Sequence, residues 1–122
     1  MIEPTNTPFS RLVFKHIHHE QFDEKKDSWQ VDGEGRMADA NLAMPWSIFS
    51  RDKKKFLAKY PDLEILHINK HTPFRWFLSG GMAYRQFVPS ASFGFFTKIE
   101  KLLSPFDNIL CSFMTIVLKK SE

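Results

Sequence analysis

The C-terminal end of the chain holds a nearly continuous apolar stretch, and this stretch limits what the chain can fold into. Between Ile109 and Leu118 it is interrupted by Ser112 and Thr115, and at ten residues it is too short to cross a bilayer as a helix. A run of this composition predicts a buried β-strand, here over residues 110–119. Because a strand buried on both faces needs neighbours along both edges, we expect it at the centre of a sheet.

One other segment has a clear strand pattern. Residues 63–69 mix apolar side chains with Glu64, His67 and Asn69, which predicts a less buried strand beside the first. One hydrogen-bonding edge of the C-terminal strand is then left without a partner. Since unpaired strand edges bind other strands, the sequence predicts a homodimer formed through this edge.

Three segments have the helical spacing of apolar residues. The first covers residues 7–19, where Thr7 can cap the helix and Pro8 fits its first turn. The second begins near Ser50 and stops at Pro61, while the third covers residues 92–103 and is expected to lie over the sheet. The predicted fold class is α+β, with a small, mainly antiparallel sheet packed with about three helices. The expected inner residues are Phe9, Leu12, Val13 and Ile17 in the first helix, Phe56, Leu57 and Tyr60 in the second, and Phe93, Phe96, Ile99, Leu102 and Leu103 in the third.

Length and composition indicate one packed domain over residues 1–122, because 43% of the residues are hydrophobic and 13 are Phe. Residues 23–40 are polar and contain glycine, with Trp29, Val31 and Met37 as their apolar anchors. This pattern predicts a long surface loop within the domain.

The net charge of +3 is too small to indicate a dedicated nucleic-acid-binding protein. The single cysteine, Cys111, lies among apolar residues, which indicates a buried thiol in a reducing compartment. We therefore expect a cytoplasmic location, no membrane partner and no nucleic-acid partner. A basic cluster on the second helix is interpreted as a solvated surface, with nucleic-acid contact as the alternative; it consists of Arg51, Lys53, Lys54, Lys55 and Lys59.

The glycines do not form a nucleotide-binding loop. Such a loop needs glycines between a strand and a helix, where the backbone approaches phosphate groups closely. Gly33 and Gly35 follow no apolar strand, Gly80-Gly81 follow an aromatic run, and Gly94 stands alone in a helical pattern. The sequence therefore predicts no cofactor-binding residues in this chain.

The order of several short segments resembles the C-terminal half of class I S-adenosylmethionine-dependent methyltransferases, and the similarity spans almost the whole chain. The segments that carry it are Ile2-Glu3-Pro4, Pro8-Phe9-Ser10-Arg11, His18-His19-Glu20, Ala40-Asn41-Leu42-Ala43-Met44-Pro45-Trp46, Phe49-Ser50-Arg51-Asp52, Tyr60-Pro61 and Leu78-Ser79-Gly80-Gly81.

The resemblance implies which strands these are. Residues 1–4 would end the fifth strand of that family's sheet, residues 63–69 would form the sixth, and residues 110–119 would form the antiparallel seventh, which lies between the other two. The family's glycine-rich loop and cofactor-binding acidic residue belong to an N-terminal half that we expect this chain to lack. S-adenosylmethionine would then bind only when a complementary N-terminal half is present, and the chain alone would be inactive.

By the same resemblance, the substrate side of the site would be built from segments after the fourth and fifth strands. His18 or His19 could remove a proton from the methyl acceptor, and Glu20 could orient that histidine. Substrate-binding candidates are Glu3, Asn41 and Trp46. The alternatives are solvated or carbonyl-capping histidines, a terminal Glu3 without a ligand, and core packing of Trp46.

Two other chemistries are considered and not predicted. His16, His19 and Glu20 have helical spacing that permits two metal ligands, but the zinc-protease order is absent, so no metal site is expected. Cys111 lies in an apolar strand and Ser79 lacks a nucleophile elbow, which excludes both as predicted nucleophiles. Two hypotheses remain: a methyltransferase fragment, inactive alone, or a non-enzymatic homodimeric interaction module derived from that fold.

Overall fold

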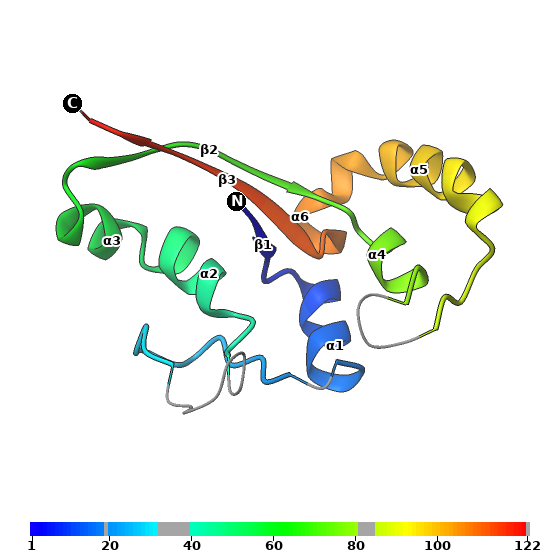
Figure 1. The fold of residues 1–122 in the computed structure, drawn as a ribbon, viewed down its shortest axis with the longest axis horizontal. Coiled ribbons are helices and arrows are strands. Elements are labelled where there is room, and N and C mark those ends of the chain that lie inside the picture. The colour runs from blue at the N-terminus through cyan, green and yellow to red at the C-terminus, as the bar shows by residue number, and fades with distance from the viewer. Residues whose placement is uncertain (19, 32–39, 81–84, 122) are drawn as a thin grey trace.

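The computed structural model describes residues 1–18, 20–31, 40–80 and 85–121. Their strands are β1 (Ile2–Pro4), β2 (Leu63–His71) and β3 (Phe113–Lys120), which form one sheet in the order β1-β3-β2 (Figure 1). Both outer strands run antiparallel to β3. The fold is therefore α+β with a three-stranded antiparallel sheet, and the C-terminal strand is its central strand, as the sequence predicts.

The central strand alternates between a covered and an open face. Met114 and Ile116 are 0% and 1% exposed and form a hydrophobic cluster with Phe49 and Phe56. On the opposite face Val117 is 41% exposed. The expectation that both faces of this strand are buried is thus wrong at Val117, because the helical segment with Phe49 and Phe56 packs against the opposite face.

The strand also begins later than predicted. Residues Asp107–Leu110 form a short helix, α6, and β3 starts at Phe113 rather than at residue 110. The apolar stretch is shared between a helical turn and a strand, a division that its hydrophobicity alone does not reveal. The linking Cys111 and Ser112 are buried, and the Ser112 hydroxyl donates a hydrogen bond to the Pro73 carbonyl (2.7 Å).

β1 pairs with part of the edge of β3 that the strand patterns left without a partner. It pairs with Phe113, Met114 and Thr115, and the Met1 amine donates to the Ile116 carbonyl over 2.8 Å. The edge of β3 is therefore covered as far as Ile116. Residues 117–120 extend past β1 and, among the described residues, pair only with β2.

The first helix, α1 (Pro8–His16), starts where the sequence predicts and ends earlier. Thr7 caps it: the Thr7 hydroxyl accepts a hydrogen bond from the Ser10 amide (3.1 Å), and Ser10 accepts one from the Thr7 amide (2.7 Å). Its predicted inner stripe is partly wrong, because Leu12 is 58% exposed whereas Phe14 is 1% exposed. Phe14 packs with Phe22 and Ala43, against Leu42, Trp76 and Phe113.

The second helical segment covers one face of the sheet. It consists of α2 (Met44–Trp46), the π-helical turn η1 (Ser47–Arg51) and α3 (Lys53–Lys59), so it begins before the predicted Ser50. Phe49 and Phe56 point from it to the sheet, and their rings meet edge to face at 4.9 Å.

The third helical segment does not cover the sheet, contrary to the sequence-based expectation. It comprises η2 (Ser90–Ser92), α5 (Phe93–Leu102), η3 (Ser104–Phe106) and α6, and it follows the short helix α4 (Arg75–Leu78). α5 contacts α4 and extends beyond the end of the sheet (Figure 1). The reason is the buried Glu100, which accepts hydrogen bonds from the Phe74 amide (3.0 Å) and the Arg75 amide (2.7 Å).

We expect Phe14→Ala to lower the free energy of unfolding by about 3–5 kcal/mol, because it removes a buried ring and leaves a cavity. Leu12→Ala, on the exposed side of the same helix, should cost about 0.5 kcal/mol or less. Urea denaturation of both variants measures the difference. Equal losses would contradict the placement of Phe14 in the core.

Candidate functional site

A cavity of about 270 Å³ lies between β1 and residues 40–49. Glu3 and Asn41, two of the predicted substrate-binding residues, line it together with apolar side chains such as Met44 and Ile48. The structure therefore brings together a strand residue and a loop residue that are 38 positions apart. A mostly apolar cavity with a single carboxylate suits a ligand that combines apolar surface with a polar or cationic group.

Asn41 holds the wall of this cavity in place. Its side-chain oxygen accepts hydrogen bonds from the Asp23 amide (2.9 Å) and the Ala43 amide (3.0 Å), and its side-chain nitrogen donates to the Asp23 carbonyl (2.7 Å). With the residue only 6% exposed, these bonds use most of the amide group. The Asn41 side chain therefore holds the segment before α2 against Asp23, independently of any contact with a ligand.

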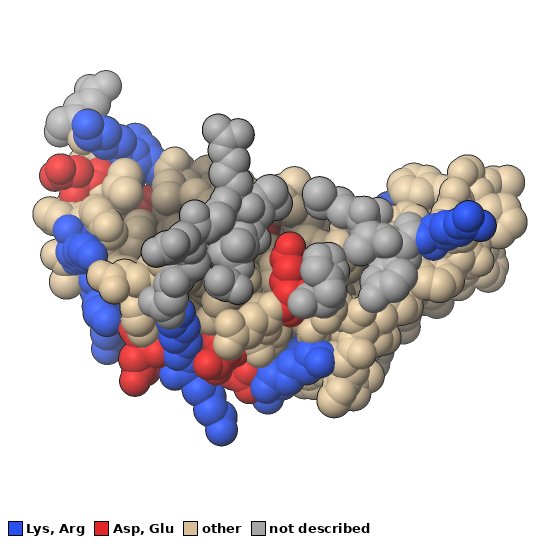
Figure 2. Space-filling view, turned by 60° about the horizontal axis from the view of Figure 1, so that its bottom comes forward, with Lys and Arg blue, Asp and Glu red and all other residues tan. Residues whose placement is uncertain are grey.

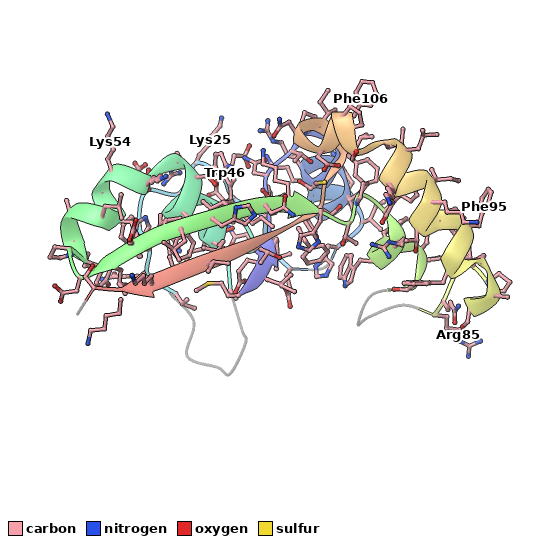
Figure 3. All side chains as sticks on the ribbon, turned by 90° about the horizontal axis from the view of Figure 1, so that it is seen from above. Lys25, Trp46, Lys54, Arg85, Phe95 and Phe106 are labelled. Atoms are coloured by element: carbon pink, nitrogen blue, oxygen red, sulfur yellow. The ribbon has the colours of Figure 1, made fainter. Side chains whose placement is uncertain are left out.

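Trp46, the third predicted substrate-binding residue, is not among the residues that line this cavity. It is half-buried and packs against the cluster of Phe49, Phe56, Met114 and Ile116. Figure 3 places it on the helical segment that covers the sheet. Its position matches the core-packing alternative.

The predicted catalytic residues lie elsewhere. The His18 ring stacks on Trp76 with 5.7 Å between ring centroids and also meets the edge of Phe14. The Glu20 backbone amide donates to Nδ1 of His18 over 3.3 Å, so Glu20 contacts the histidine through its main chain. His19 lies outside the described residues. None of the described members of this group lines the cavity that contains Glu3 and Asn41.

The structure also forms a polar cavity of about 260 Å³ that the sequence did not predict. Its lining includes His71, whose ring nitrogens lie 2.8 Å from the hydroxyl oxygens of Thr72 and Thr115. Burial, with a smaller effect of nearby Arg75, lowers the pKa of His71 below its ordinary value and favours the neutral ring. The alternating pattern of the strand before Thr72 could have predicted that His71 pairs with β3. No local sequence signal indicates that Arg75 and Glu100 line the same cavity as His71.

Arg51 and Asp52 fix the first part of the predicted 23–40 loop against the helices. The Arg51 guanidinium donates to the Glu24 carbonyl (2.6 Å) and to the Asp52 carboxylate (2.7 Å). The Trp29 indole N–H donates to the same carboxylate (3.0 Å). The hydrogen bond from Arg51 is the main cause that lowers the pKa of Asp52 to about 2. Residues 32–39 of the loop lie outside the described residues.

The ring of Trp29 contacts two lysines of the basic cluster. The ammonium groups of Lys55 and Lys59 lie 4.9 and 5.7 Å from its ring centroid, in cation–π geometry. Because Trp29 comes from a distant segment, the residue spacing along this helix gives no sign of an aromatic ring beside its lysines. The Trp29 ring is therefore already in contact with two lysine side chains of the same chain.

Cys111 is fully buried, and desolvation is the main cause that raises the pKa of its thiol to about 12. In the described part of the chain, no three His, Cys, Asp or Glu side chains are grouped so that they could hold a metal ion. Within the same residues, no helix is long and apolar enough to cross a membrane.

Compared with known proteins, the chain matches no protein-family model, no curated protein and no solved structure.

The Arg51–Asp52 pair predicts a pH dependence of stability. Asp52 has an ordinary pKa of 3.8 and a folded-state pKa of about 2, so its stabilising effect is complete above pH 3.8 and is lost as the pH falls through 2. Asp52→Asn should therefore be less stable than the wild type at neutral pH, and the difference should shrink in this acidic range. Urea denaturation against pH measures it, with the exposed Asp62→Asn as the matched control. A difference that is constant with pH would contradict this assignment.

Proposed function

We propose that this chain is the substrate-side half of a class I S-adenosylmethionine-dependent methyltransferase and acts only with a complementary half that binds the cofactor. The strand order β1-β3-β2 is the observation that carries this proposal. Because both outer strands are antiparallel to β3, they are parallel to each other. This is the arrangement that the sequence resemblance implies for the fifth, seventh and sixth strands.

The outer edge of β1 is where the complementary half would add its strands. Among the described residues, β1 pairs with β3 only. This unpaired edge favours a chain that is completed by another polypeptide.

The cofactor would be held mainly by that other half, because the described residues do not fit it. Gly80, with φ of 86°, closes α4, whereas a phosphate or adenosyl cradle needs glycines that open a helix after a strand. The part assigned to this chain is the acceptor side, where Glu3 contributes a carboxylate to the cavity beside β1. Its position next to the proposed junction would place the acceptor between the two halves.

The alternative is a non-enzymatic interaction module that dimerises through the edge of the C-terminal strand. Residues 117–120, which β1 leaves uncovered, favour it. However, this edge includes Lys119 and Lys120 and lies beside the Met1 amine. Two copies paired here would bring like charges together, and lysine on an edge strand opposes such pairing. We therefore rank the dimer second.

Isothermal titration calorimetry with S-adenosylmethionine tests the first proposal. The chain alone should give no binding heat, since its described residues form no cofactor cradle. Mixed with the polypeptide encoded immediately upstream of it, the chain should form a complex that binds the cofactor, and Glu3→Gln should weaken acceptor turnover without abolishing cofactor binding. Micromolar binding by the chain alone, or a complex without any cofactor affinity, would refute the division into two halves.

Light scattering separates the alternative from the first proposal. The chain alone should have the mass of a monomer, 14.3 kDa, because its lysines oppose edge pairing. A mass twice as large that returns to the monomer value in Val117→Lys would favour the module instead. Leu12→Lys, at an exposed apolar position on α1, is the control for non-specific effects of the added charge.

A further inference from the structure

The C-terminal helical segment carries a row of exposed apolar side chains. We call residues 85–110 the arm; it contains η2, α5, η3 and α6. Phe95 is 63% exposed, Leu102 80%, Phe106 53% and Ile109 50%. Figure 3 shows Phe95 and Phe106 projecting from the side of the arm that faces away from the sheet. Single exposed apolar residues are common, but a row of four along one segment marks a binding surface.

The side of α5 opposite these exposed residues packs against Phe74 and Arg75, and this packing determines which way the exposed residues face. Glu100 is 6% exposed and forms an ion pair with Arg75 of α4. Phe96 meets Phe74 edge to face, with 6.2 Å between ring centroids. Because these contacts are made by the opposite side of α5, the arm cannot turn its exposed row to the sheet without breaking a buried ion pair.

Every exposed charged side chain of the arm is positively charged. Its exposed charged residues are Arg85, Lys98 and Lys101, whereas its acidic residues are Glu100, which is buried, and Asp107, which is half-buried. Figure 2 shows this end of the molecule as mostly tan, with a small blue area and no red on the visible face. At helical spacing, Lys98 lies between Phe95 and Leu102 on the same side of α5.

We propose that the arm binds the surface of an anionic lipid bilayer. Phe95, Leu102 and Phe106 would enter the boundary between headgroups and acyl chains, while Lys98 and Lys101 would remain at the level of the lipid phosphates. The charge of the arm favours this occupant over a second copy, because two arms packed together would place their lysines against each other. The inference concerns a face of the chain separate from the β1 edge, goes beyond the function proposed above, and replaces the sequence-based expectation of no membrane partner.

A vesicle flotation assay with the full chain tests the proposal. The probes are vesicles of phosphatidylcholine alone and vesicles of phosphatidylcholine with phosphatidylglycerol. The chain should float with the anionic vesicles at low ionic strength, and binding should fall about tenfold or more at about 1 M salt, where the Debye length is near 3 Å. Binding to the neutral vesicles should be weaker by a similar factor.

Two pairs of variants separate the arm from the rest of the surface. Phe95→Ser with Leu102→Ser should lose most of the binding, whereas Leu12→Ser, at a position 58% exposed on α1, should retain it. Lys98→Glu with Lys101→Glu should abolish the preference for anionic lipid, whereas Lys53→Glu with Lys54→Glu on α3 should not. Circular dichroism melts confirm that each variant folds, as all of these side chains are at least half exposed or polar.

Several results would overturn the proposal. One is the absence of binding to anionic vesicles at low salt, and another is binding that survives the loss of Phe95 and Leu102. A loss of binding in the α3 variant equal to that of the arm variant would assign the effect to net charge. Self-association of the wild type that disappears in the Phe95 and Leu102 variant, without any lipid binding, would show instead that a second copy covers the arm.

Discussion

The burial of Met114 and Ile116 is the interaction on which the rest of the structure depends. These side chains are at most 1% exposed and lie on the central strand, which also pairs with both other strands. Phe49 and Phe56 pack on them from the helical segment that covers the sheet. Because one strand supplies both the backbone pairing and the centre of the hydrophobic cluster, its displacement would separate the sheet and its helices together. Within the arm, α6 contacts α1 and β2, whereas α5 lies outside this unit and contacts α4.

The position of the C-terminal strand could be predicted because its apolar content is extreme. The position of α5 could not, because an amphipathic pattern shows that a helix has an apolar side without showing what covers it. Here Glu100 pairs with Arg75, 25 residues away, and lies on the inward side of the helix. A charged residue in a helical pattern normally indicates solvent, so local sequence reasoning missed the burial of Glu100 and wrongly placed Leu102 inside, although Phe96 faces inward as expected.

The candidate site was predicted in part for a related reason. The resemblance grouped Glu3 and Asn41 as substrate-binding candidates, and the structure brings both to one cavity. It could not indicate that the Asn41 amide would be used by Asp23 and Ala43, since these bonds depend on how the loop returns. His18 was predicted to work with Glu20, yet a stacked Trp76 occupies one face of its ring. Directions of side chains, more than positions of elements, limit what sequence reasoning can assign.

The unpaired edge of β1 and the exposed side of the arm can both be covered at the same time, because different interactions hold them in place. The β1 edge is held by pairing with β3 up to Ile116, while the arm is held by the ion pair between Arg75 and Glu100. β1 pairs with the first residues of β3, and Figure 1 shows α5 beyond the sheet, so one surface can be covered while the other stays accessible. A strand added at β1 would extend the sheet without contact to α5. A chain that exposes both surfaces therefore has room for a protein partner and a lipid surface at the same time, and neither would need to displace the hydrophobic cluster under β3.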